Sequence, residues 1–156
     1  MPDDIYCIDT SSIIELNRYP RGLFPGVWRE LGKLIEIGRL IAPREVRREI
    51  MIGTDELVSW AKRNRKMFRK FDQTQKKIVD SIMAKFSDRF DLEKETPEAD
   101  PFVVALAIAT RESGLFAKCI VVTDEGKNKL SFVCRHYGIE SIKILQLFER
   151  EGWQFG

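Results

Sequence analysis

One stretch, Ile5-Tyr6-Cys7-Ile8-Asp9-Thr10-Ser11-Ser12, decides the expected fold of this chain of 156 residues. Four strand-forming residues run directly into an acid, and small hydroxyl residues follow it. An uninterrupted apolar run of this kind is typical of a strand buried on both faces, as in a parallel sheet. A carboxylate at the end of such a strand lies on the rim where open α/β sheets bind their ligands. Asp9 is therefore the first candidate for chemistry, with capping of the next helix as the alternative role.

Strands and helices are expected to alternate along the rest of the chain. Further strands are predicted at residues 40–42, 118–123 and 142–144, and helices at residues 11–17, 27–37, 43–52, 101–113, 130–137 and 145–152. This alternation predicts a three-layer α/β/α sandwich with a mostly parallel central sheet. No linker-like segment divides the sequence, so we expect a single domain over residues 1–156.

The segment 54–87 is expected to be a basic helical insertion, either a helical hairpin or one long helix. Apolar residues recur at helical spacing from Leu57 to Phe86, and the opposite face is basic. Phosphate contacts dominate nucleic-acid affinity, which favours RNA binding by this face, although a solvated helix face is the alternative. The residues predicted to contact RNA are Lys62, Arg63, Lys66, Arg69, Lys70 and, beside the last acidic motif, Lys127.

The overall composition is that of a soluble globular domain. Hydrophobic residues make up 44% and charged residues 32%, and the net charge of +2 is too small to identify a nucleic-acid binder by itself. The sequence shows neither a secretory signal nor an apolar run long enough to span a bilayer, which predicts a cytoplasmic protein without membrane contact. The three cysteines lack metal-ligand spacing and are expected to be buried free thiols.

Four acids are placed where the predicted elements would bring them together. Asp9 and Asp124 end strands, Asp100 begins the buried helix, and Glu49 lies on the helix after the second strand. In a parallel sheet these carboxylates meet at one edge, where like charges need compensation. Carboxylate ligands without histidine or cysteine favour Mg²⁺ or Mn²⁺ over zinc. The sequence therefore predicts a site for one of these ions.

The order of the acidic motifs resembles that of the PIN-domain ribonucleases. Asp9 stands in Ile-Asp-Thr-Ser, Glu49 in Glu-Ile-x-x-Gly, Asp100 in Ala-Asp-Pro-x-x-x-Ala-x-Ala, and Asp124 in Val-Val-Thr-Asp. The resemblance covers almost the whole chain. It is greatest to the toxin branch typified by VapC and to a PIN-like branch named only as a domain of unknown function.

This resemblance implies an α/β/α sandwich whose acidic pocket holds Mg²⁺ or Mn²⁺ and cuts the RNA backbone. Carried over to this sequence, the catalytic acids would be Asp9, Glu49, Asp100 and Asp124. Asp9, Asp100 and Asp124 would hold the metal, and Glu49 would position the attacking water. Ser11 and Thr123 would orient carboxylates and water. Glu45 is an alternative to Glu49, and the adjacent Glu125 is an alternative to Asp124.

The function predicted from the resemblance is that of a metal-dependent endoribonuclease, the toxin of a toxin–antitoxin pair. The implied partners are RNA, an antitoxin protein and a second copy of the chain in a homodimer. The alternative is a catalytically inactive PIN-like module that binds RNA or protein. A phosphoacceptor signalling domain is disfavoured because hydroxyl residues, rather than a second acid, follow Asp9. A haloacid-type phosphatase would need an acid at Ser11, and a phosphate-binding Gly-rich loop is absent.

Overall fold

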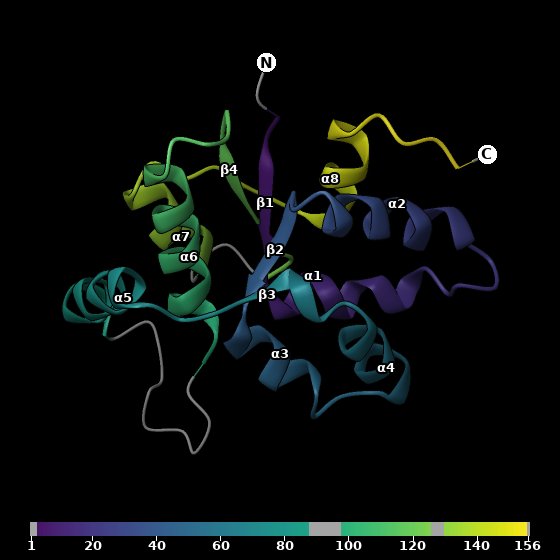
Figure 1. The fold of residues 1–156 in the computed structure, drawn as a ribbon, viewed down its shortest axis with the longest axis horizontal. Coiled ribbons are helices and arrows are strands. Elements are labelled where there is room, and N and C mark those ends of the chain that lie inside the picture. The colour runs from purple at the N-terminus through teal and green to yellow at the C-terminus, as the bar shows by residue number, and fades with distance from the viewer. Residues whose placement is uncertain (1–2, 88–97, 126–129, 156) are drawn as a thin grey trace.

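A parallel sheet lies between two layers of helices in the computed structural model, which describes residues 3–87, 98–125 and 130–155 (Figure 1). Its strands are β1 (Ile5–Ile8), β2 (Leu40–Pro43), β3 (Phe68–Arg69), β4 (Cys119–Val122) and β5 (Ser141–Ile142). Their order in the sheet is β3-β2-β1-β4-β5, and every neighbouring pair is parallel. The predicted α/β/α sandwich is confirmed.

Strand β1 occupies the centre of the sheet. Tyr6 pairs with Leu40 of β2 on one side and with Ile120 of β4 on the other. All residues of β1 and of β4 are buried. The continuous apolar run at the start of the sequence is therefore a strand covered on both faces, as its pattern predicts.

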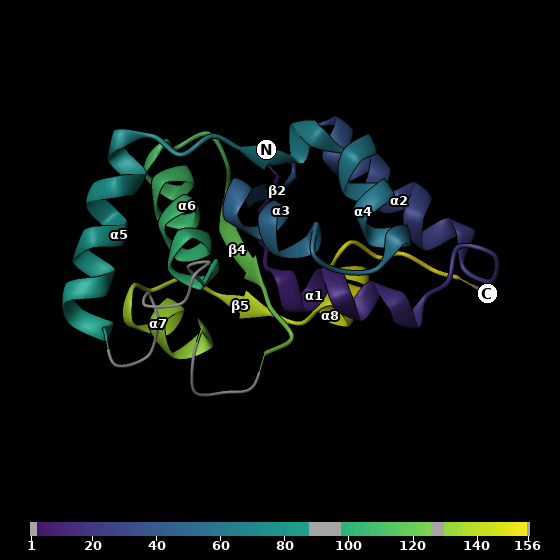
Figure 2. The same cartoon turned by 90° about the horizontal axis from the view of Figure 1, so that it is seen from below.

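The helices divide between the two faces of the sheet. They are α1 (Thr10–Glu15), α2 (Pro25–Glu36), α3 (Arg44–Ile50), α4 (Asp55–Arg63), α5 (Gln73–Phe86), α6 (Asp100–Glu112), α7 (Leu130–His136) and α8 (Ile144–Arg150). In Figures 1 and 2, α5, α6 and α7 cover one face, and α1, α2, α4 and α8 cover the other. Helix α6 packs directly on β1, β2 and β4, and residues 103–108 are all buried. It is the central apolar helix that the sequence predicts.

The predicted helical insertion over residues 54–87 is interrupted in its middle. Helix α4 ends at Arg63, a 3₁₀ turn η2 (Arg65–Met67) follows, and β3 then adds an edge strand beside β2. Asp72 begins α5 by accepting the Gln75 backbone N–H at 2.8 Å. The expectation of one long helix or a simple hairpin is wrong here because pairing with the open edge of β2 overrides the helical periodicity.

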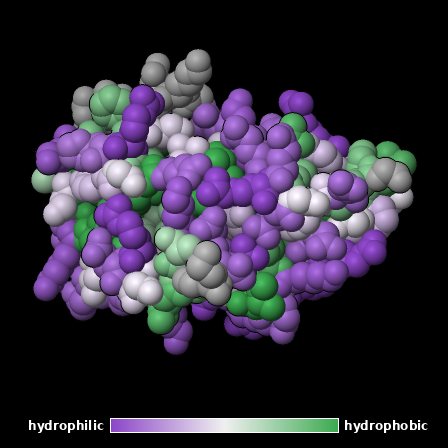
Figure 3. Space-filling view, turned by 90° about the horizontal axis from the view of Figure 1, so that it is seen from above, coloured by the Kyte–Doolittle hydropathy of each residue, from purple (hydrophilic) through white to green (hydrophobic). Residues whose placement is uncertain are grey.

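The predicted RNA-binding residues do not share one helix face. Lys66 Nζ forms an ion pair with Glu36 Oε2, at the end of α2, at a distance of 2.6 Å. The Arg69 guanidinium lies over Gly38, so that a Cβ added to this glycine would be 3.7 Å from Arg69 Nη2. Both contacts lie where β2 starts, at the amino edge of the sheet, which Figure 3 shows from above as a mostly hydrophilic surface with scattered hydrophobic patches. Lys66 and Arg69 are thus directed away from the opposite, carboxyl edge, where Asp9 lies.

Other predictions for individual residues have simpler outcomes. Lys62, Arg63 and Lys70 are exposed, whereas Lys127 lies outside the described residues. The three cysteines are buried and free, as predicted. Among the described helices, none combines the length and the apolar character needed to cross a membrane.

An ion pair fixes the last helix to the amino edge of the sheet. Arg39 donates to the two carboxylate oxygens of Glu151 at 3.1 and 2.9 Å, and the Tyr6 hydroxyl donates to the same carboxylate. Burial, together with this negatively charged neighbour, raises the pKa of Tyr6, so its hydroxyl remains a donor. The contact holds α8 beside β1 and β2, and so helps to position the start of α8 at the carboxyl edge.

Candidate metal centre

The acids gather at the carboxyl edge of the sheet, between β1 and β4. After β1 the chain adds β2 and then β3 on one side of that strand. It then passes through α5 and α6 and adds β4 on the other side of β1, so the direction of strand addition reverses there. Ligands of open α/β sheets bind outside the carboxyl ends of the strands at such a reversal of strand order. The Asp9 backbone N–H donates to the Val122 carbonyl at 3.0 Å, so the ends of β1 and β4 are tied together at this point.

Asp9 is fully buried, and its carboxylate is held by three donors. Oδ1 accepts the Ser12 backbone N–H at 3.0 Å and the Ser11 hydroxyl at 2.8 Å, while Oδ2 accepts the Thr123 hydroxyl at 2.5 Å. The bond from Ser12 makes Asp9 the N-cap of α1, so it has the capping role as well. Ser11, in the first turn of α1, and Thr123, just after β4, therefore fix the orientation of the carboxylate from two different segments.

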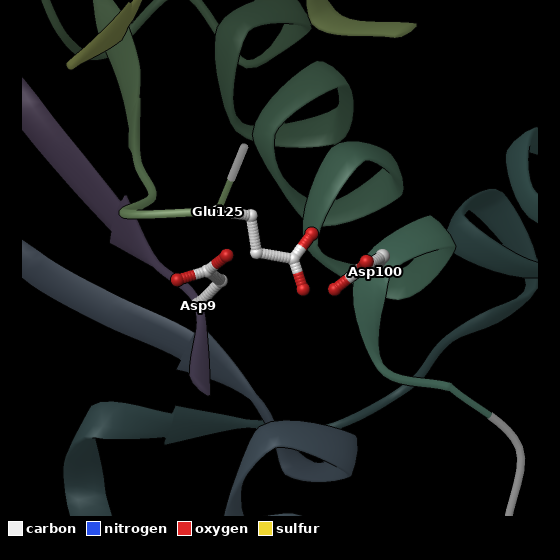
Figure 4. A group of neighbouring side chains, drawn as sticks. All are labelled: Asp9, Asp100 and Glu125. Atoms are coloured by element: carbon white, nitrogen blue, oxygen red, sulfur yellow. The ribbon is translucent and has the colours of Figure 1, made fainter. Parts of the chain in front are cut away.

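Three carboxylates converge from different segments of the chain. Asp9, Asp100 and Glu125 each offer one oxygen, and these oxygens all lie within 4.8 Å of one another. Figure 4 shows the Glu125 side chain reaching between Asp9, at the end of β1, and Asp100, at the start of α6. We call these three residues the acidic cluster. The sequence predicts Asp9 and Asp100 at this place.

The acidic cluster is electrostatically costly in the absence of a cation. Burial raises the pKa of Asp9 to about 6 against the opposing effect of its hydrogen bonds from Thr123, Ser12 and Ser11, and the charge of Asp100 raises it further. The pKa of Glu49 is also raised, first by burial and also by the charge of Asp100, while a hydrogen bond from Thr10 opposes the shift. A bound divalent cation would reverse these shifts.

Further acids line a cavity of about 260 Å³ beside the cluster. We call it the acidic cavity; its lining comprises Thr10, Ser11, Ile14, Glu49, Glu98, Asp100 and Glu125. Glu45 is not among these residues, because it is buried elsewhere and accepts a hydrogen bond from Arg44 Nε at 3.2 Å. Of the two alternatives, Glu49 is thus the acid at the cavity. Glu98 was not predicted, and no spacing distinguishes it from the other acids that precede Asp100.

The structure directs Asp124 away from the acidic cluster, which corrects its predicted place as a metal ligand. Its Oδ1 accepts the Ser12 hydroxyl and the backbone N–H of Ile144, the latter at 3.0 Å. Asp124 therefore satisfies the first turn of α8. The adjacent Glu125 instead contributes its carboxylate to the cluster.

Variants of these two adjacent acids should change different properties, the stability of the fold for Asp124 and the affinity for metal for Glu125. We expect Asp124→Ala to lower the free energy of unfolding by about 1–2 kcal/mol, because α8 loses a hydrogen bond at its start. Its affinity for Mn²⁺ should stay within twofold. Glu125→Gln should instead lose at least tenfold in Mn²⁺ affinity with little change in stability. Urea unfolding and calorimetric Mn²⁺ titration measure both, and weaker Mn²⁺ binding by Asp124→Ala alone would contradict this assignment.

The donor set of the acidic cluster fits a hard divalent cation. It offers carboxylate oxygens from Asp9, Asp100 and Glu125, with no histidine or cysteine among them. Oxygen-only sites of this kind suit Mg²⁺ and Mn²⁺ better than Zn²⁺. The hydrogen bonds that Ser11 and Thr123 donate to Asp9 are the orienting contacts that carboxylate ligands of metals commonly receive.

Comparison with known proteins places the site within a family. The family model described as "Domain of unknown function (DUF4411)" matches residues 6–155. The chain belongs to this family. The DUF4411 match runs from β1 beyond α8 and contains every acid of the cluster, but the description gives DUF4411 no activity. No curated protein matches this chain.

Proposed function

We propose that this protein is a metal-dependent endoribonuclease that hydrolyses RNA phosphodiester bonds with Mg²⁺ or Mn²⁺. The observation that carries the proposal is the convergence of Asp9, Asp100 and Glu125 within 4.8 Å at the carboxyl edge of the sheet. The resemblance of the motifs around Asp9, Glu49 and Asp100 to those of PIN-domain ribonucleases supports RNA as the substrate class.

The acidic cluster would hold the cation through Asp9, Asp100 and Glu125. When bound, the cation would supply positive charge to the phosphate and make a nearby water easier to deprotonate. Thr123 and Ser11 keep the Asp9 carboxylate in one orientation throughout the reaction, because each donates a hydrogen bond to a different oxygen of it. This preorganisation avoids reorienting the carboxylate as charge develops on the phosphate.

Glu49 is placed to act on the attacking water. Its carboxylate lines the acidic cavity and accepts a hydrogen bond from the Thr10 hydroxyl, which limits its rotation. Burial raises its pKa, which makes the carboxylate a better proton acceptor than an exposed glutamate. In the proposed reaction Glu49 accepts a proton from the water that attacks phosphorus, the P–O bond to the leaving ribose oxygen breaks, and that oxygen takes up a proton from solvent.

The alternative function is a PIN-like module that binds RNA or protein without cutting it. Such a module could use Asp9 as the N-cap of α1, but it has no need for Asp9, Asp100 and Glu125 to converge within 4.8 Å, an arrangement that is costly without a cation. We therefore favour the enzyme. An antitoxin partner, a homodimer and the role of a toxin remain predictions from the resemblance alone.

A cleavage assay on a diverse RNA pool tests the proposal. The purified protein, incubated with end-labelled total RNA, should produce internal cuts in 5 mM Mn²⁺ or Mg²⁺ and none in excess EDTA. Because the target sequence is unknown, a pool is needed rather than one oligonucleotide. Specific Mn²⁺ binding together with no cutting of any RNA would favour the binding module instead.

A further inference from the structure

A second cavity lies beside the candidate metal centre at the same edge of the sheet. It has a volume of about 170 Å³ and lies between the ends of β4 and β5 and helix α7. Thr123 and Glu125 line it, and these two residues also belong to the site already described, since Thr123 holds Asp9 and Glu125 belongs to the acidic cluster. The two cavities are therefore neighbours that share the Glu125 side chain as a wall.

The second cavity differs from the first in the sign of its charge. Arg135 of α7 and Lys143, just before α8, both line it and are both exposed. Within the described ranges neither forms a salt bridge, whereas the nearby Lys118 and Arg150 both pair with Glu140. Two cations without an acidic partner in this part of the structure are available to an anionic ligand.

The remaining lining supplies hydrogen-bond donors of the kind a phosphate accepts. Ser131 and Ser141 contribute hydroxyl groups, and both are partly buried. Gln146 Oε1 accepts the Lys143 backbone N–H at 2.7 Å, so the amide group of Gln146 is held with its NH₂ still able to donate. We call the cavity formed by Ser131, Arg135, Ser141, Lys143 and Gln146 the cationic pocket.

We propose that the cationic pocket binds the RNA phosphate next to the one that is cut, an inference that rests on the proposed ribonuclease function. The acidic cluster attracts a phosphate only through a bound cation, whereas the neighbouring phosphate of the strand needs positive charge from the protein itself. Arg135 and Lys143 provide that charge on the far side of Glu125. The proposed substrate therefore has at least two consecutive phosphodiesters, one on each side of Glu125.

Removal of the two cations should weaken RNA binding without affecting the metal. We expect Arg135→Ala and Lys143→Ala each to raise the Kd of a fluorescein-labelled single-stranded RNA octamer about three- to tenfold, measured by anisotropy in Ca²⁺. The slope of log Kd against log salt should fall by about 0.7 for each charge removed. Lys77→Ala is the matched control, because Lys77 is exposed on α5, remote from this edge, and should leave both values unchanged.

Three readouts separate this inference from the proposed function. Arg135→Lys, which keeps the charge, should retain most of the affinity, and the alanine variants should bind Mn²⁺ as the wild type does. If the wild type cuts RNA but the alanine variants bind and cut with unchanged Kd and KM, the pocket assignment is overturned and the nuclease stands. If the alanine variants lose RNA affinity but the wild type never cuts RNA, the pocket stands as a phosphate-binding site, and both the nuclease proposal and the placement of a cut phosphate beside the pocket fail.

Discussion

Asp9→Asn is expected to reduce metal-dependent RNA cleavage by about a thousandfold or more while the fold survives. The substitution removes one of the negative charges with which the acidic cluster would hold the cation, so both the cation and the phosphate lose their fixed position. Rates of RNA cleavage in Mn²⁺ measure the loss. Cleavage by the pure variant at the wild-type rate would contradict the site.

Stability of the variant distinguishes loss of chemistry from loss of fold. Asparagine keeps an oxygen that can accept the Ser12 N–H and the Ser11 hydroxyl, and it removes a charge from a fully buried position. In the wild type, burial raises the pKa of Asp9 from 3.8 to about 6, so ionised Asp9 destabilises the metal-free fold at neutral pH. In EDTA at pH 7.5, Asp9→Asn should therefore be at least as stable as the wild type in urea unfolding.

A matched control comes from the neighbouring strand end. Asp124 has the same side chain as Asp9 and lies at the same edge, but its carboxylate contacts Ser12 and Ile144. Asp124→Asn should retain most of the cleavage rate. Equal losses of activity in the two variants would show that this edge tolerates no change of charge, and would remove the specific argument for the acidic cluster.

The parts of the fold that the sequence predicts are those set by local pattern. The apolar runs of β1, of β4 and of residues 103–108 in α6 are buried as expected, because burial removes their apolar surface from water. Strand β3 was missed. It has two residues, Phe68 and Arg69, within a stretch of helical periodicity, and only its pairing with β2 makes it a strand.

The site was predictable to the level of the segments that form it. Asp9 and Asp100 each follow from an element boundary, Glu49 follows from its motif on the helix after the second strand, and the structure places the three around one edge. The choice between Asp124 and Glu125 depends on the backbone direction after β4, which no local pattern records. The side-chain directions of the basic run at 62–70 were likewise not predictable from the sequence, since Lys66 and Arg69 turn toward the amino edge of the sheet. The sequence thus predicts which segments form the site, whereas the direction of each side chain depends on tertiary contacts.

Mn²⁺ is expected to stabilise the protein strongly at pH 7.5 and weakly at pH 5. In the metal-free protein the pKa of Asp9 is about 6, above its ordinary 3.8, so between these values the folded state binds more protons than the unfolded state. The free energy of unfolding therefore falls as the pH rises through this range. The raised pKa of Glu49 acts in the same direction. Bound Mn²⁺ needs ionised carboxylates, so its binding energy grows over the range in which the metal-free protein weakens.

The magnitude follows from mass action and can be tested by urea unfolding with and without metal. At a Mn²⁺ concentration one hundred times the Kd, the free energy of unfolding should increase by about 2.7 kcal/mol at pH 7.5. At pH 5 protons compete for Asp9, and the increase should be below about 1 kcal/mol. Asp9→Asn should lose most of the Mn²⁺ effect at both pH values. An equal effect of Mn²⁺ on the variant and the wild type would place the ion elsewhere on the protein, because only a site that includes Asp9 links metal binding to the protonation of that carboxylate.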